Sequence, residues 1–326
     1  SGSGASNTAN DNTAFGFQSL YANTTGIRNT GIGCSALRAC TTTNNCTAVG
    51  YHALRTITDS GPHNVAVGSL SMEVATSARS NSAVGDGTLA LLTTGDQNVA
   101  MGHNAMMSAT TAIQNVVVGA GAVGSNVAAG SLITTGSQNT LVGAQSGRNI
   151  TTGANNTCLG YRAGTSDSPS GQLTTDNNYF VLGDDNISNL YCADTSISSS
   201  DSRDKADITN FTPGLGWIKS LRPVTYKWDK RSWYLGEDET DITAVTRDGS
   251  KKKSKVNIGF IAQEVLDIEK ENGFGDTEDT MLTVDLTDDG KRYGLKYERL
   301  VPILVNAVQE LSTKNDELAA EIATLK

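Results

Sequence analysis

The sequence predicts a mainly β protein: a repetitive stalk of β-roll or β-helical type, then a small α+β domain that ends in a coiled-coil helix. Three observations support this fold class. A short motif recurs with a nearly fixed period through residues 7–183. The composition changes near residue 200. Apolar residues follow a heptad pattern over about residues 300–326.

The repeat consists of an Asn, a small or apolar residue, two further apolar residues and a Gly. It appears, for example, as NVAVG ending at Gly68, NSAVG at Gly85 and NVAMG at Gly102, and most successive glycines are 17 residues apart. Such a period indicates a stacked solenoid. The apolar run suits a strand of about four residues, and the flanking Gly and Asn mark tight turns. Longer steps of 24 and 23 residues are interpreted as loop insertions on one face.

The apolar positions of the repeat are small, so a thin core is expected. A thin single-chain stack would be marginally stable, because little apolar surface is buried. Association of several chains around one axis would supply the missing burial.

The composition divides the chain. Residues 1–200 contain no lysine, whereas the three tryptophans, Trp217, Trp228 and Trp233, all follow. We predict a stalk over residues 1–196, a connecting segment over 197–206 and a compact domain over 207–326 with the coiled coil at about 300–326.

The bulk properties argue against several functions. A net charge of -9 disfavours nucleic acid as a partner, and no apolar run is long enough for membrane insertion. The start of the chain lacks the features of a signal peptide. The five cysteines are expected to be free thiols. Cys34, Cys40 and Cys46 are evenly spaced, but tetrahedral zinc needs a fourth ligand and only His52 is near. We predict no metal and no cofactor.

The sequence SDSRDK occupies residues 200–205, where the composition changes. A serine hydroxyl needs an adjacent base to act as a nucleophile. No histidine follows His103, so the second part of the chain offers a Ser-Lys pair rather than a Ser-His-Asp triad. Lys205 would have to be neutral, which desolvation or nearby Arg203 would favour and Asp204 would oppose. The same residue types are also typical of a polar linker without catalytic function.

Three further blocks follow: LRPVTYKW at 221–228, IGFIAQEV at 258–265 and YGLKY at 293–297. Together and in this order, the four blocks resemble the C-terminal intramolecular chaperone domain of phage endosialidases, tail fibres and neck appendages. The resemblance covers about residues 198–326 and implies an autocatalytic peptidase. It assigns Ser200 as nucleophile and Lys205 as its base, with Arg203 as a fixed position of the motif.

The same resemblance points to cleavage between Ser200 and Asp201. Attack by Ser200 on its own carbonyl would close a strained four-membered ring. This cut therefore needs the serine of a neighbouring chain, an activated water or a different register. An N→O shift would instead break the bond between Ser199 and Ser200. The sequence leaves these alternatives open.

The repeats resemble the head repeats of trimeric bacterial adhesins and of phage and large-virus fibres. This resemblance covers most of residues 7–183 and implies a trimeric β-roll or β-helical stalk. The Asn residues are interpreted as turn and stacking residues rather than as ligands.

Further elements are predicted in the C-terminal domain: a strand over 223–228, a hairpin over 243–256 with a turn at Asp248-Gly249, and a helix over 262–271. The basic run 251–253 is expected to pair with the acidic run 237–239, or alternatively to form an arm that grips the acidic stalk.

The final helix should begin near Pro302, since proline is tolerated in the first turn. Its heptad positions a and d are Val301, Val308, Asn315, Ile322 and Leu304, Leu311, Leu318, Leu325. β-Branched residues at a with Leu at d favour a coiled coil of two helices, whereas the fibre resemblance implies three helices.

The favoured function is a viral tail fibre or appendage segment, assembled in the host cytoplasm and carried on the virion. In this view the C-terminal domain makes a homotrimer, assists folding and then releases itself by autoproteolysis. A host cell-surface glycan or receptor is a candidate partner of the stalk. One alternative is a trimeric adhesin with a permanent, uncleaved clamp. Another is a glycan-degrading enzyme, but the repeats offer no clustered carboxylate pair.

Overall fold

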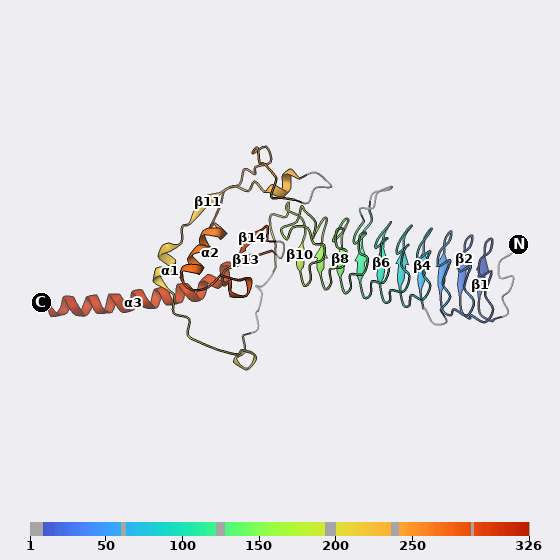
Figure 1. Cartoon of the computed structure of the whole chain (residues 1–326), viewed down its shortest axis with the longest axis horizontal. Helices are drawn as coiled ribbons and strands as arrows, with labels where there is room; N and C mark the ends of the chain where they lie inside the picture. Colours follow the sequence, from blue (N-terminus) through green and yellow to red (C-terminus); the bar gives the residue numbers. More distant parts are fainter. Residues whose placement is uncertain are drawn as a thin grey trace. The chain divides into compact units, whose positions relative to one another are not determined.

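The computed structural model describes residues 9–59, 63–121, 128–192, 200–235, 241–287 and 290–325. The chain divides into two compact units, Ser1–Leu190 and Tyr191–Lys326. Figure 1 shows the first as a row of stacked β coils and the second as a smaller mixed unit with one long helix. Each unit is described by itself below.

The first unit is a parallel β-solenoid. Each strand pairs in parallel with the strands before and after it in the chain, in the order β1 to β10. The register aligns one repeat with the next, so that Ala66, Ala83 and Ala100 form one column. The mainly β fold class is thus confirmed. The strands are β1 (Thr13–Phe15), β2 (Thr30–Ile32), β3 (Thr47–Val49), β4 (Val65–Val67), β5 (Ser82–Val84), β6 (Val99–Met101), β7 (Val116–Val118), β8 (Thr140–Val142), β9 (Thr157–Leu159) and β10 (Phe180–Leu182).

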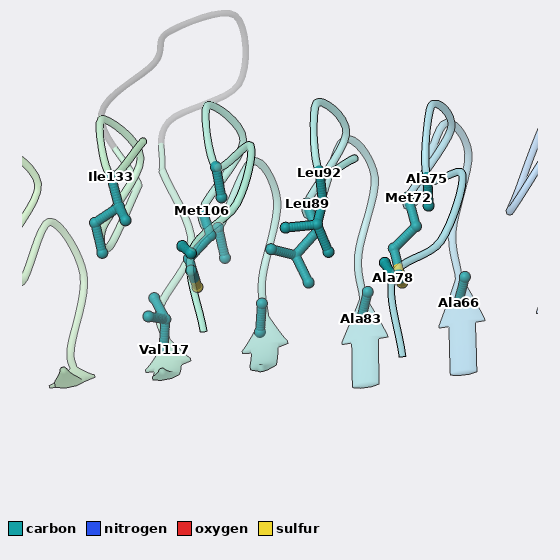
Figure 2. Close-up of a cluster of buried hydrophobic side chains, with 14 of the residues drawn as sticks. Ala66, Met72, Ala75, Ala78, Ala83, Leu89, Leu92, Met106, Val117 and Ile133 are labelled. Atoms are coloured by element: carbon teal, nitrogen blue, oxygen red, sulfur yellow. The ribbon is translucent and has the colours of Figure 1, made fainter. Parts of the chain in front are cut away.

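The core of the solenoid lies inside a single chain. The middle residue of each strand points inward, because successive side chains alternate between the two faces of a strand. Figure 2 shows strand residues such as Ala83 pointing toward turn residues such as Met72 and Leu89. These side chains are fully buried and belong to one continuous cluster. The core is built from small and medium side chains, as the sequence predicts.

A ladder of asparagines runs beside this core. The backbone N–H and the side-chain Nδ2 of Asn98 both donate to Oδ1 of Asn81, each at 2.9 Å. The second Nδ2 hydrogen of Asn98 is donated to the carbonyl of Ala112 at 2.8 Å. Asn115 repeats the pattern on Asn98. The predicted stacking role of the motif asparagines is therefore observed.

The motif glycines allow the coils to approach closely. Gly85 has φ +137°, a conformation that residues with a Cβ atom rarely adopt. A Cβ at this position would lie 2.6 Å from the carbonyl oxygen of Gly102 in the next coil. Each strand ends at the residue before its motif glycine and is three residues long rather than the predicted four.

The second unit is a small α+β arrangement. Strand β11 (Val224–Tyr226) pairs antiparallel with β12 (Asn257–Gly259), and β13 (Val284–Leu286) pairs antiparallel with β14 (Tyr293–Leu295). The helices are α1 (Leu215–Ser220), α2 (Ala262–Glu271) and α3 (Leu300–Thr324). Short 3-10 helices are η1 (Ser202–Asp204), η2 (Arg231–Tyr234), η3 (Glu278–Thr280) and η4 (Tyr297–Arg299).

A buried carboxylate fixes α2 to β13 within this unit. Glu269 is fully buried and accepts hydrogen bonds from the backbone N–H groups of Leu282, Thr283 and Val284 at 3.0, 2.6 and 3.1 Å. The Thr283 hydroxyl donates to the same carboxylate. An apolar cluster that includes Trp217 lies beside these contacts.

The elements predicted for the second unit are mostly present. The strand predicted at 223–228 is β11, the helix at 262–271 is α2, and Pro302 lies in the first turn of α3. The prediction of a hairpin over 243–256 is wrong. Only its turn remains, in which the Ser250 N–H donates to Asp248 Oδ1 at 2.9 Å.

The hairpin strands do not form because the groups around the turn bind a different segment. The Lys253 N–H donates to the carbonyl of Trp228 at 2.8 Å, and Arg247 Nη1 donates to the carbonyl of Asp229 at 2.9 Å. The Lys253 ammonium lies 4.9 Å from the centre of the Trp233 ring. The acidic run 237–239, its predicted partner, lies outside the described residues.

Candidate functional site

The motif at residues 200–205 forms a compact turn. Asp201 caps η1, and its Oδ1 accepts the Arg203 N–H at 2.9 Å. The Arg203 guanidinium also binds this carboxylate, with Nη2 2.5 Å from Oδ2. The Lys205 N–H then donates to the Ser202 carbonyl at 3.3 Å. These contacts turn the chain back on itself, so that residue 205 returns toward residue 200.

The turn brings together the two residues that the sequence analysis singles out. The Lys205 ammonium donates a hydrogen bond to the Ser200 hydroxyl, with Nζ 2.7 Å from Oγ. This distance is within the range required for proton transfer between a nucleophile and its base. Both side chains are exposed in the single chain. Ser199, on the other side of the alternative cleavage site, lies outside the described residues.

Asp201 and Arg203 form an ion pair within the turn. The Arg203 guanidinium lowers the pKa of the Asp201 carboxyl, and that carboxylate in turn raises the pKa of Arg203. The positive charge of Arg203 is thus directed to Asp201. From the sequence, Arg203 is a fixed motif position and a cation near Lys205, and the capping role of Asp201 is not predicted. The Asp-x-Arg spacing was the available signal, since Asp side chains often accept the N–H two residues further on.

Helix α3 presents two different faces. On one face, Ile303 and Ala307 are buried, and Asn306 Nδ2 donates to the carbonyls of Phe211 and Pro213 at 2.7 and 3.1 Å. The heptad a and d positions lie on the other side and are exposed. Their exposed fractions are 55% for Val301, 45% for Leu304, 64% for Val308, 45% for Leu311, 55% for Leu318, 55% for Ile322 and 86% for Leu325.

Asn315 and its neighbours in the last turns of α3 are also exposed. The predicted heptad stripe is therefore a row of solvent-facing side chains in the single chain, and all of them are apolar except Asn315. A row of this kind is the contact surface of a coiled coil.

Among the described residues, no group of three or more His, Cys, Asp or Glu side chains could hold a metal ion. No helix in the described part of the chain is long and apolar enough to cross a membrane. All five cysteines are free: Cys40, Cys46 and Cys158 are buried, Cys34 is partly buried and Cys192 is exposed.

A parallel β-solenoid joined to a small α+β unit with an exposed heptad helix defines a fibre-like protein with a C-terminal accessory domain. Residues 200–274 match the family model described as chaperone of endosialidase. The second unit therefore contains a segment that matches this family, and the resemblance drawn from the sequence blocks is confirmed for the three blocks that lie within residues 200–274. The match begins at Ser200 and ends before β13. A search of curated proteins and a search of solved structures found no match.

This combination fits a tail-fibre-like protein with a C-terminal chaperone domain. The family supports a chaperone role for the second unit.

Proposed function

We propose that this chain is a segment of a viral tail fibre or appendage that forms a homotrimer. Its C-terminal domain brings three copies together, assists folding of the solenoid and then releases itself by autoproteolysis. The observation that carries the proposal is the 2.7 Å contact between Lys205 Nζ and Ser200 Oγ at the first residue of the chaperone match.

The proposed chaperone action follows from the solenoid itself. A coil with a three-residue strand cannot bury its own apolar face, so the first coils gain stability only when neighbouring coils are stacked on them. A domain that holds copies in parallel near one end raises their local concentration there. The exposed heptad stripe of α3 supports this role, because three stripes can bury one another.

The proposed cleavage is an acyl transfer. Neutral Lys205 takes the proton of the Ser200 hydroxyl while Oγ attacks a peptide carbonyl. The carbonyl–nitrogen bond then breaks, the amine leaves with a proton, and water hydrolyses the ester. For the bond between Ser200 and Asp201, ring strain requires the serine of a neighbouring copy or a water activated by Lys205.

Assembly would also provide the environment that this chemistry needs. A lysine acts as a base only when neutral, and desolvation favours the neutral form. Because Lys205 is exposed in the single chain, neighbouring copies are the proposed source of that desolvation. Cleavage should therefore follow trimer formation and not precede it.

The test is the intact mass of the full chain over time. The wild-type chain should split into fragments near 1–200 and 201–326, whereas Ser200→Ala and Lys205→Ala should stay whole. Ser202→Ala, in the same turn, is the matched control and should be cleaved. If every variant stays whole while light scattering shows a trimer, the dyad is inert.

A second experiment separates assembly from chemistry. Leu318→Asp places a charge in the exposed stripe of α3, beyond the turns that contain the buried residues Ile303 and Ala307. We expect this variant to be monomeric and uncleaved. Efficient cleavage of the monomer would contradict the requirement for a neighbouring copy.

The exposure of Ser200 and Lys205 also supports a second candidate, a trimeric adhesin or receptor-binding stalk with a permanent clamp. In that case a folded trimer would remain full length on prolonged incubation. For either candidate, we propose a host cell-surface glycan or receptor as the partner of the stalk and the virion as the location of the fibre.

A further inference from the structure

The solenoid sheet has an outer face that is free of charge. This outer sheet face consists of the first and third residues of strands β1 to β10. The third positions are all apolar: Phe15, Ile32, Val49, Val67, Val84, Met101, Val118, Val142, Leu159 and Leu182. The first positions are Thr13, Thr30, Thr47, Val65, Ser82, Val99, Val116, Thr140, Thr157 and Phe180.

These side chains face outward because the residue between them faces the core. In β6, Ala100 is fully buried, whereas Val99 and Met101 are 37% and 44% exposed. Val116 of the next strand is 40% exposed beside fully buried Val117. Valine and methionine in these positions leave a continuous apolar strip in contact with water along the sheet. Such strips are uncommon on monomeric proteins and mark interaction surfaces.

The turns that complete each coil differ from the outer sheet face because they carry charges. Side chains of successive turns form ion pairs, such as Arg79 with Asp59 and Arg55 with Glu73. Ile113, an exposed apolar residue in a turn, aligns with two polar residues: its N–H donates to the Ser137 hydroxyl at 3.3 Å, and Asp96 Oδ1 accepts the N–H of Arg79 in the coil before. The outer sheet face is thus the uncharged side of the described coils.

We infer that the outer sheet face is the surface through which the solenoids of three copies pack against one another. This inference rests on the proposed homotrimer and adds to it the face of the stalk that is used. The occupant is a second copy of this chain in parallel orientation.

Periodicity identifies a second copy as the occupant. The apolar rows repeat at the spacing of parallel strands, about 4.8 Å, along the whole sheet. Another copy has the same spacing, so its rows can interdigitate from β1 to β10. A partner with a different repeat would lose register after a few coils.

Charge and orientation agree with this choice. Neither surface carries a charge, so their contact buries no unpaired ion. The exposed heptad stripe of α3 belongs to the same chain and also requires parallel copies. Around a threefold axis every copy uses an equivalent surface, and the outer sheet face carries no charge that would be repeated around that axis.

Site-directed cross-linking of the full chain tests the inference. Val99, Met101 and Val116 are replaced by Cys one at a time, and a short bismaleimide is added. Thr94→Cys and Thr111→Cys are matched controls, since both positions are exposed in turns of the same coils. All variants also carry Cys34→Ser and Cys192→Ser, which removes the accessible native thiols.

We expect at least a tenfold higher yield of covalent dimers and trimers from the three strand positions than from the turn positions. Light scattering on the same samples separates this inference from the proposed function. A trimer in which strand and turn positions cross-link equally would overturn the assigned face and leave the homotrimer intact. A monomer without cross-links would contradict both proposals.

Discussion

The carboxamide oxygen of Asn81 accepts two hydrogen bonds from Asn98, one from its backbone N–H and one from its side chain. Because Asn98 presents its own oxygen to Asn115 in the same way, one side-chain type links successive coils through the buried interior. The ladder satisfies polar groups that stacking would otherwise bury without partners.

Replacing one rung should therefore destabilise more than one coil. Asn98→Ala would leave the backbone N–H of Asn115 without its acceptor, and it would remove the side-chain donor to Asn81 Oδ1 and to the carbonyl of Ala112. Each buried unsatisfied donor costs about 1–3 kcal/mol, so we expect a loss of about 3 kcal/mol in the free energy of unfolding. Thermal or denaturant unfolding followed by circular dichroism measures it. Exposed Gln97→Ala is the control, and an equal loss in both variants would contradict a structural role of the ladder.

Gly85→Ala should be among the most damaging single-atom additions to the stalk. The new Cβ would meet the backbone carbonyl of Gly102, which cannot move without separating two coils, and φ is unfavourable as well. We expect a loss of about 3 kcal/mol or more. Gly216→Ala, where a Cβ meets nothing within 4 Å, should be neutral or stabilising. Similar melting temperatures for the two variants would disprove this explanation.

The thiols should fall into two reactivity classes. Burial raises the pKa of Cys46 and of Cys158 to about 12, and the reactive thiolate of each therefore forms only well above neutral pH. At pH 8 a disulfide reagent should modify Cys192 rapidly and Cys34 more slowly. Cys40 and the two high-pKa thiols should react only after denaturation. Rapid modification of all five in the native protein would show that the solenoid core is open.

The Asp201–Arg203 contact should persist in mildly acidic solution. Because the contact lowers the Asp201 pKa, it contributes fully above the ordinary aspartate pKa of about 3.9 and is lost as the pH falls through the lowered pKa. Titration of the Asp201 carboxyl carbon by NMR should give a midpoint below about 3.9. Arg203→Gln should move this midpoint upward, whereas Arg247→Gln should leave it unchanged. An unchanged midpoint in Arg203→Gln would show that Asp201 and Arg203 do not form this contact in solution.

Glu269 should be essential to the second unit. Glu269→Ala would leave the N–H groups of Leu282, Thr283 and Val284 buried without an acceptor. We expect a loss of about 3–5 kcal/mol in the stability of this unit, since each buried N–H group left without an acceptor costs about 1–3 kcal/mol. Urea unfolding monitored by tryptophan fluorescence measures it. The exposed neighbour Glu271 provides the control, because Glu271→Ala should change stability little.

Local patterns predicted many elements correctly because local forces dominate there. The 17-residue period specified coils, since a motif that turns and extends at fixed positions repeats its geometry. The strand at 223–228 and the helix at 262–271 follow from alternation and amphipathicity. The hairpin at 243–256 failed because Lys253 and Arg247 bind carbonyls of the 228–229 segment, which is distant in sequence.

By itself, the sequence determined the solenoid class and the heptad helix, because each depends on spacing along the chain, and its resemblance to a chaperone family pointed to Ser200 and Lys205 as the candidate pair. Only the tertiary structure decided the contacts that depend on chain reversal and on stacking. The cap by Asp201 brings Lys205 Nζ to 2.7 Å from Ser200 Oγ, and the register of ten strands turns alternate residues into a continuous uncharged face. The physical reason is that a pattern fixes which residues recur, whereas packing fixes which of them meet.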